Sequence, residues 1–156
     1  QDIESSVNQL VEIAVRALSP GVNDPFTAIS CVDHLGSALC RLAQRELPSP
    51  YRHDRQDQLR LIAPVITFAE ITDAAFNQIR QYGRSSAAVT IRMLEMISVI
   101  AEFAHRPEQR AALLRHADMI ARGARDGLPE VEDRGAVEEA YQAACQACRK
   151  PARPGP

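Results

Sequence analysis

Apolar residues recur at spacings of three and four over most of the chain, and this helical period constrains the fold more than any other feature. The first stripe lies within residues 2–18 and consists of Ile3, Val7, Leu10, Val11, Ala14 and Leu18. The second lies within residues 25–45 and consists of Ala28, Ile29, Val32, Leu35, Leu39 and Leu42. The pattern predicts two amphipathic helices, and the short link between them predicts that they run antiparallel.

Proline and glycine mark where these helices end. Residues 19–21 are Ser-Pro-Gly, which stops the first helix. Asn23 or Asp24 can cap the second helix, whose first position is the preorganised Pro25. Residues 51–62 follow another proline-rich break and alternate weakly around a turn, so we expect a small β-hairpin there.

The third and fourth predicted helices differ in polarity. Thr67 and Glu70 match a capping box at the start of a helix that ends near residue 82. Residues 87–104 are apolar except for one narrow polar stripe, which is typical of a helix surrounded by others. We therefore expect this helix at the centre of the core. The residues expected to be buried there include Ile91, Leu94, Ile97, Ile100 and Phe103.

Two further helices complete the prediction. One opens with Pro107 and carries a one-sided apolar stripe, and the last covers residues 134–149. Residues 150–156 are rich in proline and cannot continue a helix, so we expect a disordered tail. The sequence thus predicts an all-α fold, a bundle of about six helices with one small β-hairpin insertion, forming a single domain over residues 1–149.

Charge and motifs exclude several classes of function. The 18 basic and 20 acidic side chains give a net charge of −2, which argues against nucleic acid as a partner. No apolar run approaches the ~18 residues that span a bilayer. No phosphate-binding loop, dinucleotide fingerprint or serine nucleophile motif is present. We therefore predict no catalytic residues, no cofactor and no enzymatic activity.

Four cysteines could form a metal or redox site, but their spacing does not favour either kind of site. Cys145 and Cys148 form a Cys-x-x-Cys pair near a helix C-terminus, where the helix dipole opposes the thiolate. A zinc site needs two more ligands, and Cys31 and Cys40 lie on opposite faces of one helix. We interpret all four as reduced packing residues and predict no bound metal.

The four histidines show no ligand spacing. His34, His53, His105 and His116 lack any partner at four residues, and His116 and Asp118 are two apart, hence not on one helical face. An exposed histidine on a helical bundle could accept a phosphoryl group, and His34 is the best placed. A lone helical histidine is far more often a surface or capping residue, which is our interpretation here.

One polar cluster is a candidate site. The loop of residues 19–27 lies between two apolar stripes at the start of a helix, where free N–H groups can bind anions. Its structural interpretation is a helix cap, with Asn23 ordering a tight turn. Its functional interpretation is a ligand or partner site built from Asn23, Asp24 and Thr27 with the nearby Arg16.

Several longer runs point to a known family. They are the segments at residues 9–28 (QLVEIAVRALSPGVNDPFTA), 31–36 (CVDHLG), 47–52 (LPSPYR), 59–64 (LRLIAP), 73–82 (DAAFNQIRQY) and 113–118 (LLRHAD). Together they resemble a family of bacterial predicted membrane proteins of unknown function, domain of unknown function twenty-two fifty-four. The resemblance implies that transmembrane helices precede this part in the full-length protein. It implies no activity and carries over no catalytic residue.

These observations lead to one functional hypothesis and two alternatives. We expect the soluble interaction or regulatory part of a bacterial inner-membrane protein, on the cytoplasmic side, forming a homo-oligomer through the apolar start of its first helix. The main alternative is a small-ligand or ion sensor with a polar pocket beside the 19–27 loop. An enzyme of unrecognised type comes third.

Overall fold

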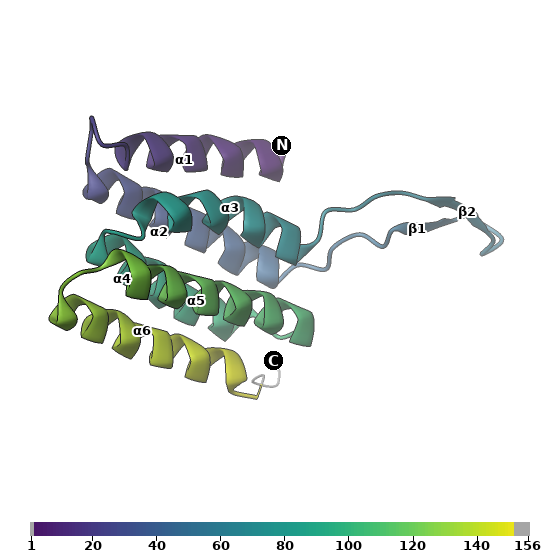
Figure 1. Cartoon of the computed structure of the whole chain (residues 1–156). Coiled ribbons are helices and arrows are strands. Elements are labelled where there is room, and N and C mark those ends of the chain that lie inside the picture. The colour runs from purple at the N-terminus through teal and green to yellow at the C-terminus, as the bar shows by residue number, and fades with distance from the viewer. Residues whose placement is uncertain (1, 152–156) are drawn as a thin grey trace.

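The computed structural model describes residues 2–151, which form six helices and one β-hairpin (Figure 1). In chain order the elements are α1 (Ile3–Ala17), α2 (Pro25–Ala43), β1 (Tyr51–His53), β2 (Leu59–Ile62), α3 (Phe68–Gly83), α4 (Ala87–Phe103), α5 (Pro107–Gly127) and α6 (Val131–Arg149). The predicted all-α fold with a small hairpin is confirmed. The expected disordered tail falls largely on residues 152–156, outside the described residues.

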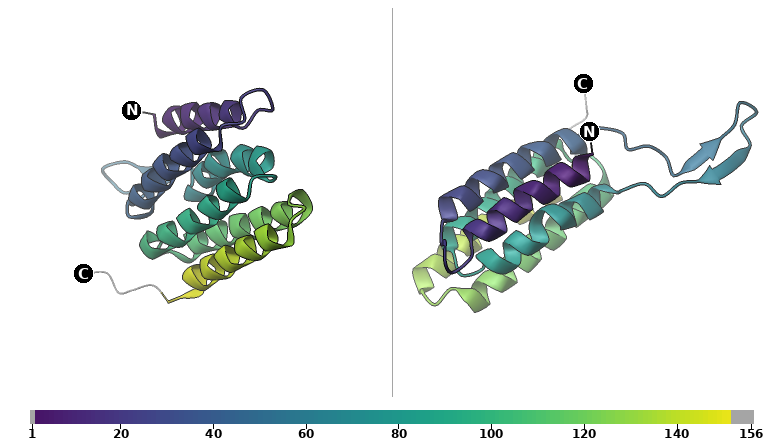
Figure 2. Two further views of the ribbon diagram at one scale, coloured as in Figure 1. Left: turned by 90° about the vertical axis from the view of Figure 1, so that its left-hand side faces the viewer. Right: turned by 90° about the horizontal axis from the view of Figure 1, so that it is seen from above.

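The helices form two layers. α1, α3 and α5 pack beside one another in one layer, and α2, α4 and α6 form the other (Figure 2). α4 lies between α2 and α6 and also contacts α5, which confirms its predicted central place. Successive helices run in opposite directions, so α1 and α2 are antiparallel as expected and α3 runs parallel to α5 (Figure 1).

Polar side chains fix most of the helix starts. The capping box at α3 forms as predicted, since Thr67 accepts from the backbone of Glu70 and the Glu70 carboxylate accepts from the backbone of Thr67. α6 begins at Val131 rather than at residue 134. The reason is the carboxylate of Glu130, which accepts from the backbone N–H of Val131 and so starts the helix earlier.

The core lies between the two layers. α4 contributes Leu94, Ile97 and Ile100, all fully buried as predicted. Ile91 and Phe103 were expected there too, and that expectation is wrong because both are only half-buried. The reason is helical phase. Ile91 shares a face with the polar stripe, since Glu95 and Ser98 follow four and seven residues later, and Phe103 lies one turn beyond the exposed Val99.

The hairpin projects away from one end of the helical layers (Figures 1 and 2). β1 and β2 pair antiparallel with Tyr51 opposite Ile62, and every strand residue is exposed. The Asp54 carboxylate orders the turn by accepting from the backbone N–H of Gln56 at 2.8 Å and from the Nε of Arg60 at 2.7 Å. The hairpin is therefore held by its own hydrogen bonds and adds nothing to the core.

Candidate interaction site

The predicted 19–27 loop is a tightly bonded helix cap. Asp24 precedes α2, and its carboxylate accepts from the backbone N–H of Thr27 at 3.1 Å and from the Thr27 hydroxyl. The backbone N–H of Asp24 donates to the carbonyl of Ala17 at 2.7 Å, which ties the cap back to α1. Asn23 has a φ of 47°, a left-handed conformation that asparagine tolerates better than most residues. These bonds build the turn that the sequence predicts.

Electrostatics agree with the capping role of Asp24. The hydroxyl of Thr27 and then its backbone N–H hold the pKa of the Asp24 carboxyl below its ordinary value. The carboxylate therefore stays ionised and occupies the start of α2, where the helix dipole favours negative charge. An external anion would have to compete with it for the same N–H groups.

The other predicted site residues do not all converge with Asp24. The structure brings Thr27 to Asp24, whereas Arg16 pairs with Glu12 one turn back on α1, at 2.6 Å between Nη2 and Oε1. Asn23 donates its backbone N–H to the Ser19 carbonyl at 2.8 Å. That these four residues bind a ligand or partner stays a prediction.

The loop also carries two apolar side chains that sequence reasoning did not single out. Val22 is 61% exposed and Phe26 is 83% exposed, on either side of the cap. The hydrogen bonds of Asp24 keep the loop in one conformation, so these side chains are presented on a rigid support. Phe26 follows Pro25, the first residue of α2, and nothing in the local sequence pattern shows on which side of the helix its side chain lies.

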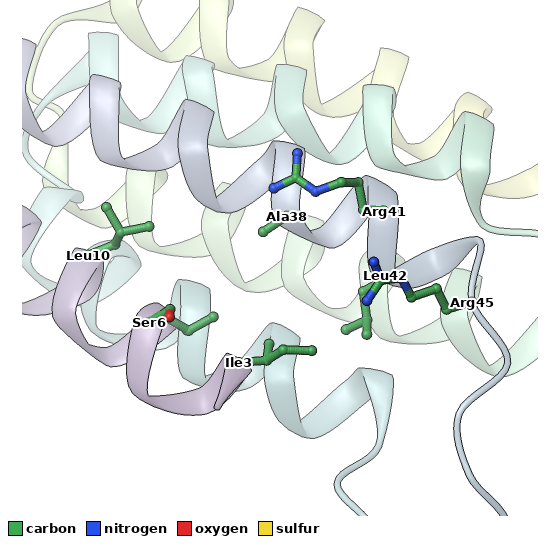
Figure 3. Close-up of a pocket in the computed structure, with 8 residues that line it drawn as sticks. Ile3, Ser6, Leu10, Ala38, Arg41, Leu42 and Arg45 are labelled. Carbon is green, nitrogen blue, oxygen red and sulfur yellow. The ribbon is translucent and has the colours of Figure 1, made fainter. Parts of the chain in front are cut away.

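A second surface is the α1–α2 groove, defined by Ile3, Ser6 and Leu10 of α1, Arg41 and Leu42 of α2, and Arg45, which lies two residues after α2 ends (Figure 3). It is a hollow of about 200 Å³ near the end of the bundle where α1 begins. Ile3, predicted to lie on the buried stripe of α1, is 43% exposed here. The stems of Arg41 and Arg45 flank an apolar floor, an arrangement that suits a helix or chain segment with an apolar face.

A buried polar group connects α3 and α5. His116 was expected at the surface, and that expectation is wrong, since the side chain is completely buried against the ring of Phe76. Its Nε2 lies 2.7 Å from an Asp73 oxygen, and Arg115 donates to the same carboxylate. Sequence spacing could not reveal this contact because Asp73 lies on another helix.

Burial sets the charge state of this group. Burial lowers the pKa of His116 below its ordinary value of 6.5, although the hydrogen bond to Asp73 opposes the shift. Burial would raise the pKa of Asp73, but hydrogen bonds from Arg115 and His116 outweigh it and hold that pKa low. The pair is therefore a carboxylate that accepts from a neutral imidazole N–H near pH 7.

The cysteines and His34 lie in environments without evident chemistry. Cys31, Cys145 and Cys148 are buried and unpaired, and burial raises the pKa of Cys148 to about 11, which keeps the thiol protonated. His34 is exposed, and its Nδ1 lies 2.7 Å from the carbonyl of Ser30. Within residues 2–151, no three His, Cys, Asp or Glu side chains are grouped so that they could hold a metal ion.

Comparison with known protein families shows to which family the chain belongs. The family described as "Predicted membrane protein (DUF2254)" matches residues 1–98. The chain belongs to this family. The predicted resemblance to this family is thereby confirmed, and the match includes the runs between residues 9 and 82. The family description concerns a membrane protein of unknown function and indicates no catalytic role.

The curated relatives that match the chain are longer proteins. An uncharacterized protein of Mycobacterium tuberculosis and another of Mycobacterium bovis are each 35% identical to the chain over 151 residues. The matched stretch covers 97% of this chain but 29% of each relative, so the chain spans less than a third of their length. No solved structure matches the chain. In the part that the structure describes, no helix combines the length and apolarity needed to cross a membrane.

Proposed function

We propose that this chain is the soluble interaction or regulatory domain of a larger integral membrane protein of the DUF2254 family, and that it acts by contact rather than by catalysis. Membership in a family described as a membrane protein supports the first part. The small share of the relatives that the chain covers supports the view that other segments carry the membrane part.

The α1–α2 groove is the observation that carries the proposal. A helix that begins a bundle normally buries its apolar stripe, yet Ile3 remains 43% exposed and Leu10 is only partly covered. Arg41 and Arg45 are exposed at the edge of the same hollow. We infer that a membrane-side segment of the full-length protein lies against this groove and couples the membrane part to the helical layers.

The bacterial inner membrane is the proposed location, with this domain on its cytoplasmic side. Three buried cysteines support the choice, because their unpaired thiols suit a reducing compartment. Without its membrane part, the chain would leave the α1–α2 groove open to water. We therefore propose that the chain by itself forms a symmetric homodimer through this groove.

Light scattering of the isolated chain tests the proposal. The unmodified chain is expected to have the mass of a dimer, and Ile3→Asp should give a monomer because a carboxylate would be buried in the apolar contact. Ile13→Asp is the matched control, since Ile13 lies on the same helix, is 48% exposed and does not line the groove. A strictly monomeric chain, or dimers that survive Ile3→Asp, would contradict the groove as the contact surface.

A further inference from the structure

The hairpin has one largely apolar face that the helices leave open. Paired residues of two antiparallel strands lie on the same face of the sheet, and successive residues of a strand alternate between faces. Tyr51 pairs with Ile62, and His53 pairs with Leu59. Tyr51 and His53 are two residues apart, so both pairs share one face. Its three large apolar side chains, Tyr51, Leu59 and Ile62, are 53%, 50% and 64% exposed.

Arginines accompany this apolar face. Arg52 lies on the opposite face of the hairpin, and Arg60 is the additional residue where the strand register shifts. The hairpin contains three arginines and two aspartates. Arg60 pairs with Asp54, whereas the exposed Arg52 and Arg55 form no ion pair in the part of the chain that the structure describes. The hairpin therefore presents two unpaired cations beside exposed apolar side chains.

The two ends of the helical layers differ in charge. The turn between α5 and α6 lies at the end opposite the hairpin (Figure 1). Residues 126–139, which include this turn, carry six acidic side chains and one basic side chain, Arg134. A negatively charged surface would attract the hairpin and repel the opposite end. The charge distribution therefore favours an orientation in which the hairpin faces such a surface.

A second protein fits the apolar face of the hairpin less well than a lipid surface does. A stable protein interface buries about 800 Å² on each partner, and three partly exposed side chains supply only a fraction of that area. Two copies that met through this face would also bring their arginines together. A bilayer needs less contact, because the proposed membrane part of the full-length protein already holds the domain beside it.

We propose that the hairpin lies flat in the interfacial layer of an anionic phospholipid bilayer. Its apolar face contacts the upper acyl chains, and Arg52 and Arg55 bind lipid phosphates. Tyr51 suits this layer, because a tyrosine ring is apolar and its hydroxyl is polar. Arginine stems reach from apolar surroundings to the headgroups. The turn, residues 54–58, is entirely polar, so the hairpin does not enter the hydrocarbon tip-first.

Co-sedimentation with vesicles measures the proposed contact. The vesicles consist of phosphatidylcholine alone or of phosphatidylcholine with phosphatidylglycerol, which is anionic. The chain should bind the vesicles that contain phosphatidylglycerol, and added salt should weaken the binding because it screens the arginines. The inference rests on the proposed membrane location but not on the α1–α2 groove. Vesicle binding and the mass of the chain in solution are separate readouts, so either proposal can fail while the other stands.

Two variants with matched controls assign the binding to the hairpin. Ile62→Ser and Arg52→Gln should each weaken binding to anionic vesicles about fivefold, which is the contribution of one basic residue near such a membrane. Val131→Ser is the control for the apolar change, because Val131 is 66% exposed and lies in the acidic region. Arg122→Gln is the control for the lost charge, because Arg122 is exposed on α5. Both controls should bind as the unmodified chain does.

A tryptophan reporter locates the contact. The chain contains no tryptophan, so a single introduced one reports on its own surroundings. With anionic vesicles, the emission of Tyr51→Trp should shift to shorter wavelength, and lipids with brominated acyl chains should quench it. Tyr82→Trp is the matched control, since Tyr82 is 57% exposed and lies at the end of α3 away from the hairpin. Its emission should not change.

The possible results separate a lipid surface from other partners. Thermal unfolding checks that Ile62→Ser keeps its fold, and Tyr51→Trp tests the contact if it does not. The proposal would be overturned by no binding to anionic vesicles, by equal binding to both kinds of vesicle, or by unchanged emission of Tyr51→Trp. Equal binding by a folded Ile62→Ser would also overturn it. Self-association without lipid that Ile62→Ser abolishes would assign the face to a second copy and reject the bilayer.

Discussion

The helical layers and the hairpin use apolar residues in opposite ways. The helices turn most of their apolar residues inward, and Ile97 and Leu94 of α4 have no exposed surface. The hairpin leaves Leu61 and Ile62 about three-fifths exposed, at 59% and 64%. A two-stranded hairpin is at best marginally stable in water without a packed face. Folding free energy is therefore concentrated in the helices, whereas the apolar residues of the hairpin remain available for contacts.

The largest expected effect comes from the centre of the helical layers. Ile97→Ala should destabilise the chain by about 2–5 kcal/mol, because it removes buried methyl groups and leaves a cavity among rigid neighbours. Val99→Ala is the matched control, since Val99 lies two residues away and is 41% exposed. Urea denaturation measures both. A loss below about 0.5 kcal/mol for Ile97→Ala would remove the basis for calling α4 central.

Disrupting the contact between α3 and α5 should destabilise the chain less than Ile97→Ala does. The loss of stability should depend on pH. His116→Gln is expected to cost about 1–3 kcal/mol, since it disturbs a buried hydrogen bond to Asp73. Burial lowers the pKa of His116, so the unfolded chain takes up its proton first. Stability is then full above pH 6.5 and falls as the pH drops below it toward the folded pKa.

Denaturation midpoints at several pH values between 7.5 and about 5 check this prediction. The unmodified chain should lose stability over that range, and His116→Gln should lose less, because its side chain does not titrate. The same slope in both proteins would show that His116 does not have the lowered pKa assigned to it.

Loss of the cap of α2 should destabilise the chain by a smaller amount than the change at His116. Asn23→Ala and Asp24→Ala should each lower stability by about 0.5–2 kcal/mol, the usual range for a lost cap or turn. Asp24→Asn is the control, because its side-chain oxygen can still accept from the backbone of Thr27. If Asp24→Ala kept its stability but lost a response to an added small ligand, the sensing interpretation of the 19–27 loop would replace the capping one.

Substitutions in the hairpin should change the stability of the chain least. Leu61→Ser is expected to change the stability of the chain by less than about 0.5 kcal/mol, because Leu61 touches no buried cluster and is 59% exposed. Thermal unfolding measures the change. A loss as large as that of Ile97→Ala would mean that the hairpin packs against the helices in solution.

Local signals in the sequence account for much of the fold. Helix starts are predictable because Thr67, Glu70 and Asp24 act on their own backbone neighbours. The start of α6 was missed because Glu130 bonds the next residue, a weaker signal than a serine or threonine cap. Ile91 was placed in the core by its hydrophobicity, although its helical phase puts it with polar residues.

The candidate sites were less predictable because they join distant segments. The cap of α2 was found, since Asp24 and Thr27 are three residues apart, but its exposed Phe26 was not. The group around His116 requires Asp73, which is 43 residues away in the chain. Its position follows from the parallel packing of α3 and α5, and no local periodicity encodes that packing.

Cysteine labelling of the α1–α2 groove tests the central proposal most directly. Ser6→Cys places a thiol in the groove, and Ser5→Cys places one at a neighbouring exposed position outside it. Labelling by a maleimide would be compared between the isolated chain, diluted until monomeric, and the full-length protein in its membrane. The account predicts that both positions react in the isolated chain and that only Ser6→Cys is protected in the full-length protein. Equal labelling of Ser6→Cys in the two settings would contradict the groove as the contact with the membrane part.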